Sequence, residues 1–533
     1  MEIPNRVIVG MRAVAVKDIL PAERVMPASD PCAAISLRDV SFSFFSRRDF
    51  ALKNINLDIF RGEFVIITGP SGCGKSTLAA AMAGFMPQGI QGDLQGEITI
   101  NGRSTRAGDL SSLAVQASLC QQDPEAQICT LRVSDEVAFG PENLELPARE
   151  VVSRVKEALL ATNSLHLKDR SIFDLSGGEK QKVAIASMLA MQSEIIILDE
   201  PTSNLDPESA QEVLSAVEGL REKKITVVVI EHRFDRLLKI ADRLIVMEAG
   251  RVAMDGNPTE VYERYRESQG CGISRKPAPG HRIKSAKGED EIIYVRDLQY
   301  SYNGHKVLGG ISFSARKGEL IGIIGPNGSG KTTFLNCLAG LCRPSSGVIR
   351  VDGINVTESR VSEMARSIGF VFQNPNHQIF ENTVLAEVTF ACKNLKISKE
   401  RSERFARIAM EEHGIIQYAQ DSPLMLSYGE KRRLNICATL PHNPGIILLD
   451  EPFIGQDISN TERIMEDLVR LKDAGKTLLI VSHDMDRIFR DCDRIVFFQS
   501  GSILVDETPS KAIDAIRNLG AYHFLPDIYL LSS

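Results

Sequence analysis

The chain has 533 residues, of which 43% are hydrophobic and 25% are charged, and its formal net charge at pH 7 is −7. This composition is ordinary for globular domains, and the mild negative charge and absence of Trp argue against a large nucleic-acid surface. No apolar run approaches the roughly 18–20 residues that cross a bilayer, so we expect any membrane role to depend on other, membrane-spanning proteins. The ten Cys include no Cys-x-x-Cys pair, which favours a reducing, cytoplasmic location.

In chain order, the sequence divides into two large domains. Residues 1–34 lack the apolar core of a signal peptide and are interpreted as an N-terminal extension. The first domain is predicted at 35–265 and the second at 292–519. Between them, 266–291 is rich in Gly, Ser, Lys and Pro without apolar periodicity, which is typical of a linker. The tail, 520–533, is short and partly apolar, so we expect it to pack against a domain or a partner.

The predicted elements occur in the same order in both domains. Each domain opens with a strand of alternating polar and apolar residues, and a short apolar strand then precedes a glycine-rich loop and a helix. For the first domain we predict the apolar strand at 64–68 and the helix at 76–84, and for the second at 320–324 and 332–340. The apolar runs 195–198, 225–230 and 446–449 are predicted to be buried parallel strands.

Three motifs recur in these domains. Gly-x-x-x-x-Gly-Lys-Ser/Thr occurs at 69–76 and 325–332. Leu-Ser-Gly-Gly-Glu at 175–179 is matched by Leu-Ser-Tyr-Gly-Glu at 426–430, and Leu-Asp-Glu-Pro at 198–201 recurs at 449–452. The latter two pairs are both 251 positions apart, which indicates a tandem duplication of one unit.

The glycine-rich loops are predicted to bind the phosphates of a nucleotide. Backbone N–H groups can surround phosphates only where side chains do not block them, and the helix that follows directs its positive end at the same place. Lys75 and Lys331 are expected to reach the β- and γ-phosphates, and the hydroxyls of Ser76 and Thr332 to bind Mg²⁺. The predicted loop residues are Gly69, Ser71, Gly72, Gly74, Lys75, Ser76 and Thr77, and Gly325, Asn327, Gly328, Gly330, Lys331, Thr332 and Thr333.

Paired carboxylates follow an apolar run in each domain. The first of each pair, Asp199 and Asp450, is suited to hold Mg²⁺. The second, Glu200 and Glu451, is placed to polarise an attacking water.

The order of these motifs over about 450 residues resembles the ATP-binding cassette (ABC) ATPases. The resemblance implies an α/β fold of two tandem P-loop domains, each with a mixed sheet and a helical signature subdomain, that binds ATP and Mg²⁺. It also implies roles for further residues. Gln122 and Gln373 correspond to the glutamine that contacts Mg²⁺ and water, and His232 and His483 to the histidine that contacts the γ-phosphate. Phe44, with Phe45 as a rival, and Tyr302 correspond to the aromatic that stacks on adenine.

In this family two cassettes pair head to tail, so that each ATP lies between one glycine-rich loop and the other domain's signature. Ser427 and Gly429 would then complete the Lys75 site, and Ser176 and Gly178 the Lys331 site. Tyr428 replaces the first signature glycine, and we therefore predict two hydrolysis-competent but unequal sites, the weaker built on Lys75. The alternative is that Tyr428 is tolerated without consequence.

The sequence after each family glutamine favours one class of transporter. Both domains read Gln-x-Pro-x-x-Gln, at 122–127 and 373–378, which looks like the cassettes of energy-coupling factor importers. That resemblance implies membrane partners, one coupling subunit and one vitamin- or metal-capturing subunit, and a peripheral location on the cytoplasmic membrane face. A tandem sugar-importer ATPase and a cassette ATPase acting on ribosomes or DNA are the alternatives. The short linker and the absence of a long coiled-coil insertion disfavour the latter.

Overall fold

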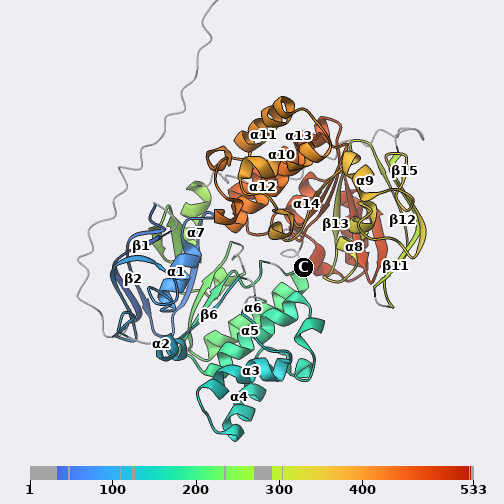
Figure 1. Cartoon of the computed structure of the whole chain (residues 1–533). Coiled ribbons are helices and arrows are strands. Elements are labelled where there is room, and N and C mark those ends of the chain that lie inside the picture. The colour runs from blue at the N-terminus through green and yellow to red at the C-terminus, as the bar shows by residue number, and fades with distance from the viewer. Residues whose placement is uncertain are drawn as a thin grey trace, which may run out of the picture.

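The computed structural model describes residues 33–45, 49–107, 110–122, 124, 127–203, 205–232, 234, 236–268, 291–302, 304–526 and 529. They form two lobes with closely similar element order (Figure 1). Each lobe contains a six-stranded and a four-stranded sheet with helices around them, so the predicted fold class, two tandem α/β domains, is confirmed.

The six-stranded sheets have equivalent strand orders. In the first lobe the order is β10-β9-β3-β8-β7-β6, and in the second β20-β19-β13-β18-β17-β16. All neighbouring strands are parallel except the β9–β10 and β19–β20 pairs. The strands are β3 (Phe64–Thr68), β6 (Ala117–Cys120), β7 (Ile195–Asp199), β8 (Thr226–Ile230), β9 (Arg243–Glu248) and β10 (Arg251–Gly256), and β13 (Leu320–Ile324), β16 (Ile368–Val371), β17 (Ile446–Asp450), β18 (Thr477–Val481), β19 (Arg494–Gln499) and β20 (Ser502–Glu507).

An antiparallel sheet lies beside each of these sheets. Its strand order is β2-β1-β4-β5 in the first lobe and β12-β11-β14-β15 in the second. The strands are β1 (Ala33–Phe44), β2 (Leu52–Phe60), β4 (Gly92–Ile100) and β5 (Arg103–Ser104), and β11 (Glu291–Tyr302), β12 (His305–Arg316), β14 (Ser346–Val351) and β15 (Ile354–Asn355).

Helices cover the sheets and form a separate subdomain in each lobe. The subdomain helices are α3 (Val133–Asn143), α4 (Ala148–Ala161) and α5 (Gly177–Met191), and α10 (Val384–Asn394), α11 (Lys399–Glu412) and α12 (Tyr428–Thr439). The others are α1 (Lys75–Met82), α2 (Leu110–Gln116), α6 (Pro207–Glu222), α7 (Pro258–Ser268), α8 (Lys331–Leu338), α9 (Val361–Ser367), α13 (Ile458–Asp473), α14 (Met485–Asp491) and α15 (Pro509–Asn518). In Figure 1 the α3–α4 and α10–α11 regions lie at opposite ends of the molecule, as expected for lobes that pair head to tail.

The central strands are the most buried part of the protein. Every residue of β3, β7, β8, β13, β17 and β18 is buried, which explains why their sequences are continuous apolar runs. The carboxyl ends of these parallel strands meet at one edge of each sheet, and the motif residues follow directly there. The helix α1 ends before Gly84, which is left-handed at φ 79°, so its last residue lies two positions before the predicted end.

The domain boundaries can be compared with the ordered elements. β1 begins at Ala33 and α7 ends at Ser268, two and three residues beyond the boundaries predicted at 35 and 265. Most of the predicted N-terminal extension and linker lies outside the described residues. In the predicted tail, the short helix η9 (Tyr522–Phe524) contacts α6 of the first lobe, while Phe524 and Leu525 are buried in the second lobe.

Candidate functional site: two nucleotide sites at one interface

The two glycine-rich loops connect a buried strand to a helix. A Cβ on Gly69 or Gly325 would lie 2.1 Å from a carbonyl oxygen of the neighbouring strand, so only glycine fits there. Lys75 Nζ donates to the carbonyls of Gly69 and Pro70 at 2.9 and 3.0 Å, and Lys331 Nζ donates to its two equivalents at 2.7 Å. Each ammonium group therefore lies inside its own loop.

Two carboxylates end the strand beside each loop. Asp199 is the last residue of β7 and Glu200 follows it, Asp450 and Glu451 are placed in the same way at β17, and all four are buried. Glu200 and Glu451 have left-handed backbones, at φ 48° and 51°, and each backbone N–H donates to the last carbonyl of the adjacent strand. A non-glycine residue held in this region is strained, and such strain is concentrated at functional sites.

The two carboxylate pairs have different electrostatic surroundings. Burial and the charge of Glu200 raise the pKa of Asp199 to about 6. Burial acts to raise the pKa of Glu200 also, but the charge and hydrogen bond of His232, with the charge of Lys75, hold it below its ordinary value. Burial, helped by the charge of Asp450, raises the pKa of Glu451 to about 8 despite Lys331.

The family glutamines are held differently in the two lobes. Gln122 Nε2 donates to Glu200 Oε2 at 2.8 Å, which brings the glutamine and the carboxylate together. Gln373 is exposed, and its backbone carbonyl accepts a hydrogen bond from Arg432. The glutamine of the second lobe is therefore fixed through its backbone.

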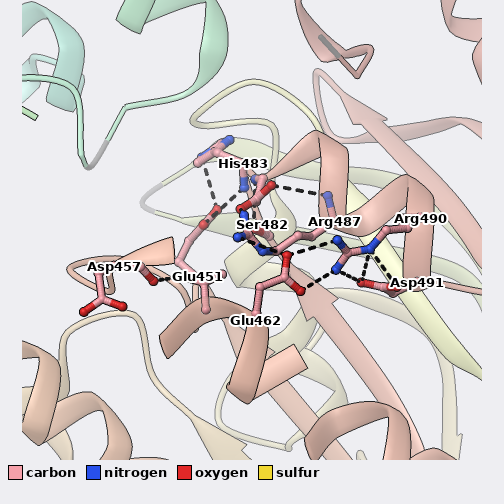
Figure 2. Close-up of polar contacts among 10 residues, drawn as sticks. Glu451, Asp457, Glu462, Ser482, His483, Arg487, Arg490 and Asp491 are labelled. Atoms are coloured by element: carbon pink, nitrogen blue, oxygen red, sulfur yellow. Dashed lines mark hydrogen bonds and ion pairs between the residues drawn. The ribbon is translucent and has the colours of Figure 1, made fainter. Parts of the chain in front are cut away.

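Both histidines lie against the carboxylates. His232 Nε2 is 3.1 Å from Glu200 Oε1, and His483 Nε2 is 3.1 Å from Glu451 Oε1. His483 also lies 3.1 Å from Asn327 Oδ1, so it joins the carboxylate to the glycine-rich loop. Figure 2 shows the His483–Glu451 contact.

An ion-pair network lies behind His483. Arg487 pairs with Asp484 at 2.6 Å and with Glu462 of α13 at 3.4 Å, and Arg490 pairs with Glu462 and Asp491 at 2.9 and 2.7 Å (Figure 2). This network ties α14, which follows the histidine, to α13. Where the second lobe has α14, the described residues of the first lobe form the 3₁₀ turn η5 (Leu237–Lys239).

The lobes are joined at the glycine-rich loops. The backbone N–H of Ser71 donates to Asp457 Oδ2 of the second lobe at 2.7 Å, and its hydroxyl donates to the Gly455 carbonyl at 3.3 Å. The backbone N–H of Asn327 donates to Asp206 Oδ2 of the first lobe at 3.1 Å. Asp206 and Asp457 also cap α6 and α13. A cavity of about 360 Å³ between the lobes is lined by both glutamates and both histidines.

The signature motifs begin α5 and α12. Ser176 with Glu179, and Ser427 with Glu430, form capping boxes, which gives Leu-Ser-x-Gly-Glu a local structural role. A Cβ on Gly178 would lie 2.6 Å from Ser209 Cβ, and one on Gly429 would lie 3.1 Å from the Gly455 carbonyl oxygen. The second signature glycines thus permit close packing against the segments that touch the opposite lobe.

The first signature glycine has more room. A Cβ on Gly177 would meet only Leu205, at 3.8 Å, and Gly177 has no positive φ. The equivalent backbone in the second lobe can therefore accept the side chain of Tyr428. The side chain itself lies outside what the structure describes.

The predicted adenine-stacking residues differ in exposure. Phe44 is half-buried and packs edge-on against Phe42, with ring centroids 5.0 Å apart. Phe45 is 76% exposed and Tyr302 is 64% exposed. Phe44 and Tyr302 both end the first strand of their lobe, and Phe45 lies one residue further on.

One polar link was not predicted from the sequence. Glu231 is buried beside His232 and accepts from the backbone N–H and hydroxyl of Thr202, at 3.0 and 2.6 Å. It joins the histidine loop to the segment that carries Asp206. In the second lobe Ser482 and Phe453 occupy these positions, and a comparison of the lobes at the 251-residue spacing could have found the difference.

The comparisons with known proteins agree with this arrangement. The model of the ABC transporter family matches residues 52–203 and 308–454. The chain belongs to the ABC transporter family. An ABC transporter ATP-binding protein of Methanosarcina mazei, so named provisionally, is 34% identical over 94% of this chain and 93% of its own. A Bacillus subtilis protein with the provisional name HMP/thiamine import ATP-binding protein YkoD is 33% identical over 90% of this chain and 92% of its own.

Among solved structures, cbiO1 from Clostridium perfringens, described as part of the ABC transporter complex cbiONQ, is 32% identical, with a TM-score of 0.40 over 46% of this chain and 100% of that one. Family membership makes this ABC protein an ATPase whose hydrolysis is coupled to transport, working at the cytoplasmic membrane face. Within the described residues, none of the helices has the length and apolar character that a bilayer span requires.

Proposed function

We propose that this protein is the ATP-binding subunit of an energy-coupling factor importer for a vitamin or metal ion. The main support for the proposal is the sequence Gln-x-Pro-x-x-Gln, which begins at Gln122 in the first lobe and at Gln373 in the second. The similarity to a relative whose name gives HMP/thiamine import, over nine tenths of the chain, supports it. The name of that relative does not specify the cargo of this chain.

Two composite ATP sites follow from the contacts between the lobes. One site consists of Lys75, Gln122, Glu200 and His232, completed by Ser427 and Gly429. The other consists of Lys331, Gln373, Glu451 and His483, completed by Ser176 and Gly178. The hydrogen bonds from Ser71 to Asp457 and from Asn327 to Asp206 support this pairing, because each joins one glycine-rich loop to the opposite lobe. The covalent link between the lobes favours pairing within one chain.

Magnesium fits beside each loop. Oδ1 of Asp199 and Oδ1 of Asp450 are buried and, among the described residues, have no hydrogen-bond partner. The hydroxyls of Ser76 and Thr332 interact with these carboxylates. We assign Asp199 with Ser76, and Asp450 with Thr332, as the magnesium-binding residues, with Gln122 and Gln373 nearby. Magnesium, when bound, neutralises charge on the phosphate oxygens.

Other residues of the chain have separate roles in hydrolysis. Glu200 and Glu451 accept the proton of the attacking water, and His232 and His483 hold these carboxylates in place. Asp206 and Asp457 bring the opposite lobe against each loop. Loss of the γ-phosphate removes contacts that both lobes share, so hydrolysis reopens the interface.

The helical subdomains offer surfaces for the membrane subunits. Leu131 and Phe173 are 68% and 76% exposed, and the Ile172 N–H donates to the Leu131 carbonyl, so these two residues lie on adjacent segments. In the second lobe Phe380 and Leu424 are 70% and 74% exposed. Exposed apolar groups of this kind, found at the helical subdomain of each lobe, suit helices of a membrane partner.

Affinity purification from membranes tests the proposal. Tagged protein should co-purify with integral membrane subunits, and Phe173→Asp with Leu424→Asp should reduce their recovery at least fivefold. Val152→Asp, a change at an exposed apolar residue of α4, should leave recovery unchanged. Recovery of ribosomes in place of membrane subunits would overturn the proposal.

A further inference from the structure

The signature helix α12 of the second lobe holds the family-glutamine loop of the same lobe. The guanidinium of Arg432, which is fully buried, donates to the backbone carbonyls of Phe372 and Gln373. Asn435, one turn further along, is also fully buried and donates to the Pro375 carbonyl at 3.0 Å. Lys431 adds a bond to Asn376 Oδ1 at 3.0 Å. These bonds bind the loop to the helix along its length.

A buried guanidinium is costly unless its donors are satisfied, so its place here is a specific feature. Its position also has an electrostatic consequence, because its charge partly offsets the burial that raises the pKa of Asp450 and of Glu451. Arg432 thus lies between the start of the signature helix and the catalytic carboxylates of its own lobe.

The first lobe has different residues at the positions equivalent to Arg432 and Asn435. Gln181 replaces Arg432, and its side-chain amide donates to Cys120 Sγ at 3.3 Å. Ala184 replaces Asn435, so this position has no polar side chain. Within the described part of the Gln122 loop, position 181 therefore provides no counterpart of the charged, two-pronged attachment that Arg432 makes to the Gln373 loop.

We propose that Arg432 is a positioning residue. Through it, nucleotide binding at the Lys75 site changes the position of Gln373 at the Lys331 site. The inference rests on the proposed pairing of the sites. In that pairing Ser427, at the start of α12, belongs to the Lys75 site, whereas Gln373 belongs to the Lys331 site. Because Arg432 makes α12 and the Gln373 loop move together, a shift of the signature moves Gln373 toward or away from Glu451. The equivalent coupling in the opposite direction, from the Lys331 site to the Lys75 site through Gln181, is weaker.

The test isolates turnover at each site with single glutamate variants of the full chain. In Glu200→Gln the remaining ATP hydrolysis reports the Lys331 site, and in Glu451→Gln it reports the Lys75 site. Adding Arg432→Gln, which installs the first lobe's residue, should lower kcat about tenfold in the Glu200→Gln background, with KM changed less than twofold. In the Glu451→Gln background the change in kcat should stay within twofold. Gln181→Ala, the matched control, should change neither background more than twofold.

A merely structural role for Arg432 would lower kcat in both backgrounds equally, and that result would overturn the proposal. Amide hydrogen exchange at 372–376 should also accelerate in Arg432→Gln, while exchange at 120–122 should not. If Arg432→Gln does not fold, Arg432→Lys is the second variant, because it keeps the charge but cannot donate to both carbonyls in the same way. It should also lower kcat in the Glu200→Gln background and not in the Glu451→Gln background. Failure of the site pairing itself would appear separately: Ser427→Arg would then leave turnover at the Lys75 site, measured in the Glu451→Gln background, unchanged.

Discussion

In the first lobe the buried carboxylate of Glu231 joins the histidine loop to its neighbours, whereas the second lobe has buried and partly buried arginines paired with carboxylates and carbonyls. Arg236, the first lobe's counterpart of Arg487, bonds to the neutral Gln211. Glu231 joins the His232 loop to Thr202 and so to the segment that reaches the opposite lobe. In the second lobe, Arg487 and Arg490 tie α14 to Glu462 of α13, and Arg432 holds the Gln373 loop. Both lobes nonetheless place their motif residues on equivalent strands.

This comparison teaches that the two copies differ mainly between the motifs. The residues expected to touch nucleotide are nearly the same in both lobes, and the packing that positions them is not. In the proposed pairing each lobe contributes to both composite sites, so a difference in one lobe should affect both sites. Variants made in matched pairs, one in each lobe, therefore test whether the two lobes contribute differently to the two sites.

The largest effect is expected from the catalytic carboxylates. Removing a general base costs roughly 10²- to 10⁴-fold in rate, so the Glu200→Gln, Glu451→Gln double variant should lose at least 100-fold in steady-state ATPase. The single variants should be unequal, with the greater loss for Glu451→Gln, because its site is completed by the intact Gly177–Gly178 signature. Equal losses in an ATPase assay would contradict the predicted inequality.

The contacts between the lobes should come next. Asp457→Ala removes the acceptor for the Ser71 N–H and the cap of α13, so we expect about a tenfold loss of ATPase and about 1 kcal/mol less stability to unfolding. Asp206→Ala should cost less activity, because its bond to Asn327 is longer.

Asp457→Asn is the control for the helix cap. Asparagine caps helices as well as aspartate, so the melting temperature should return to the wild-type value while ATPase stays reduced. Full recovery of ATPase would show that the aspartate charge at the interface is unimportant.

A smaller effect is expected at the first signature glycine. Tyr428→Gly in the Glu451→Gln background should raise turnover at the Lys75 site about threefold by relieving crowding near the γ-phosphate. Gly177→Tyr in the Glu200→Gln background is the matched change and should lower turnover at the Lys331 site. No response to either change would support the alternative that a tyrosine is tolerated here.

The last prediction concerns stability and its dependence on pH, not turnover. His413 is buried in the second lobe, and burial, with the charges of Arg463 and Arg433, lowers its pKa to about 4. The unfolded chain, with a histidine pKa of about 6.5, binds more protons between these values, so stability falls as the pH falls from about 6.5 to about 4. At pH 5 the loss is on the order of 1–2 kcal/mol.

His413→Gln removes the titrating group and should reduce this loss. Urea denaturation of the full chain at pH 7 and pH 5 measures it. Thr162 occupies the equivalent position of the first lobe, so Thr162→Ala serves as a control that should not alter the pH dependence. The same loss in wild type and His413→Gln would refute the assignment.

Much of this fold could be predicted because the central strands and loops have short-range signals. The buried strands appear as apolar runs, and the glycine-rich loops directly follow two of them. The roles of the nucleotide-binding residues stay predictions, since they depend on the resemblance and on the pairing of the lobes.

The remaining features depend on long-range packing. Arg432 lies in the run Lys431-Arg432-Arg433, which reads as an exposed basic helix face, yet it is fully buried beneath a loop 60 residues earlier. Glu231 resembles any acidic residue at a strand end, and only the fold brings it to Thr202. The contact of η9 with α6 joins segments about 300 residues apart and has no local signal.

The central claim is that one chain closes on itself around two ATP molecules. ATP binding to the Glu200→Gln, Glu451→Gln variant, measured by equilibrium dialysis alongside light scattering, tests it most directly. The account predicts two ATP bound per chain while the protein remains a monomer, and the loss of one with either Lys75→Ala or Lys331→Ala. Binding of two ATP only when two chains associate would contradict it.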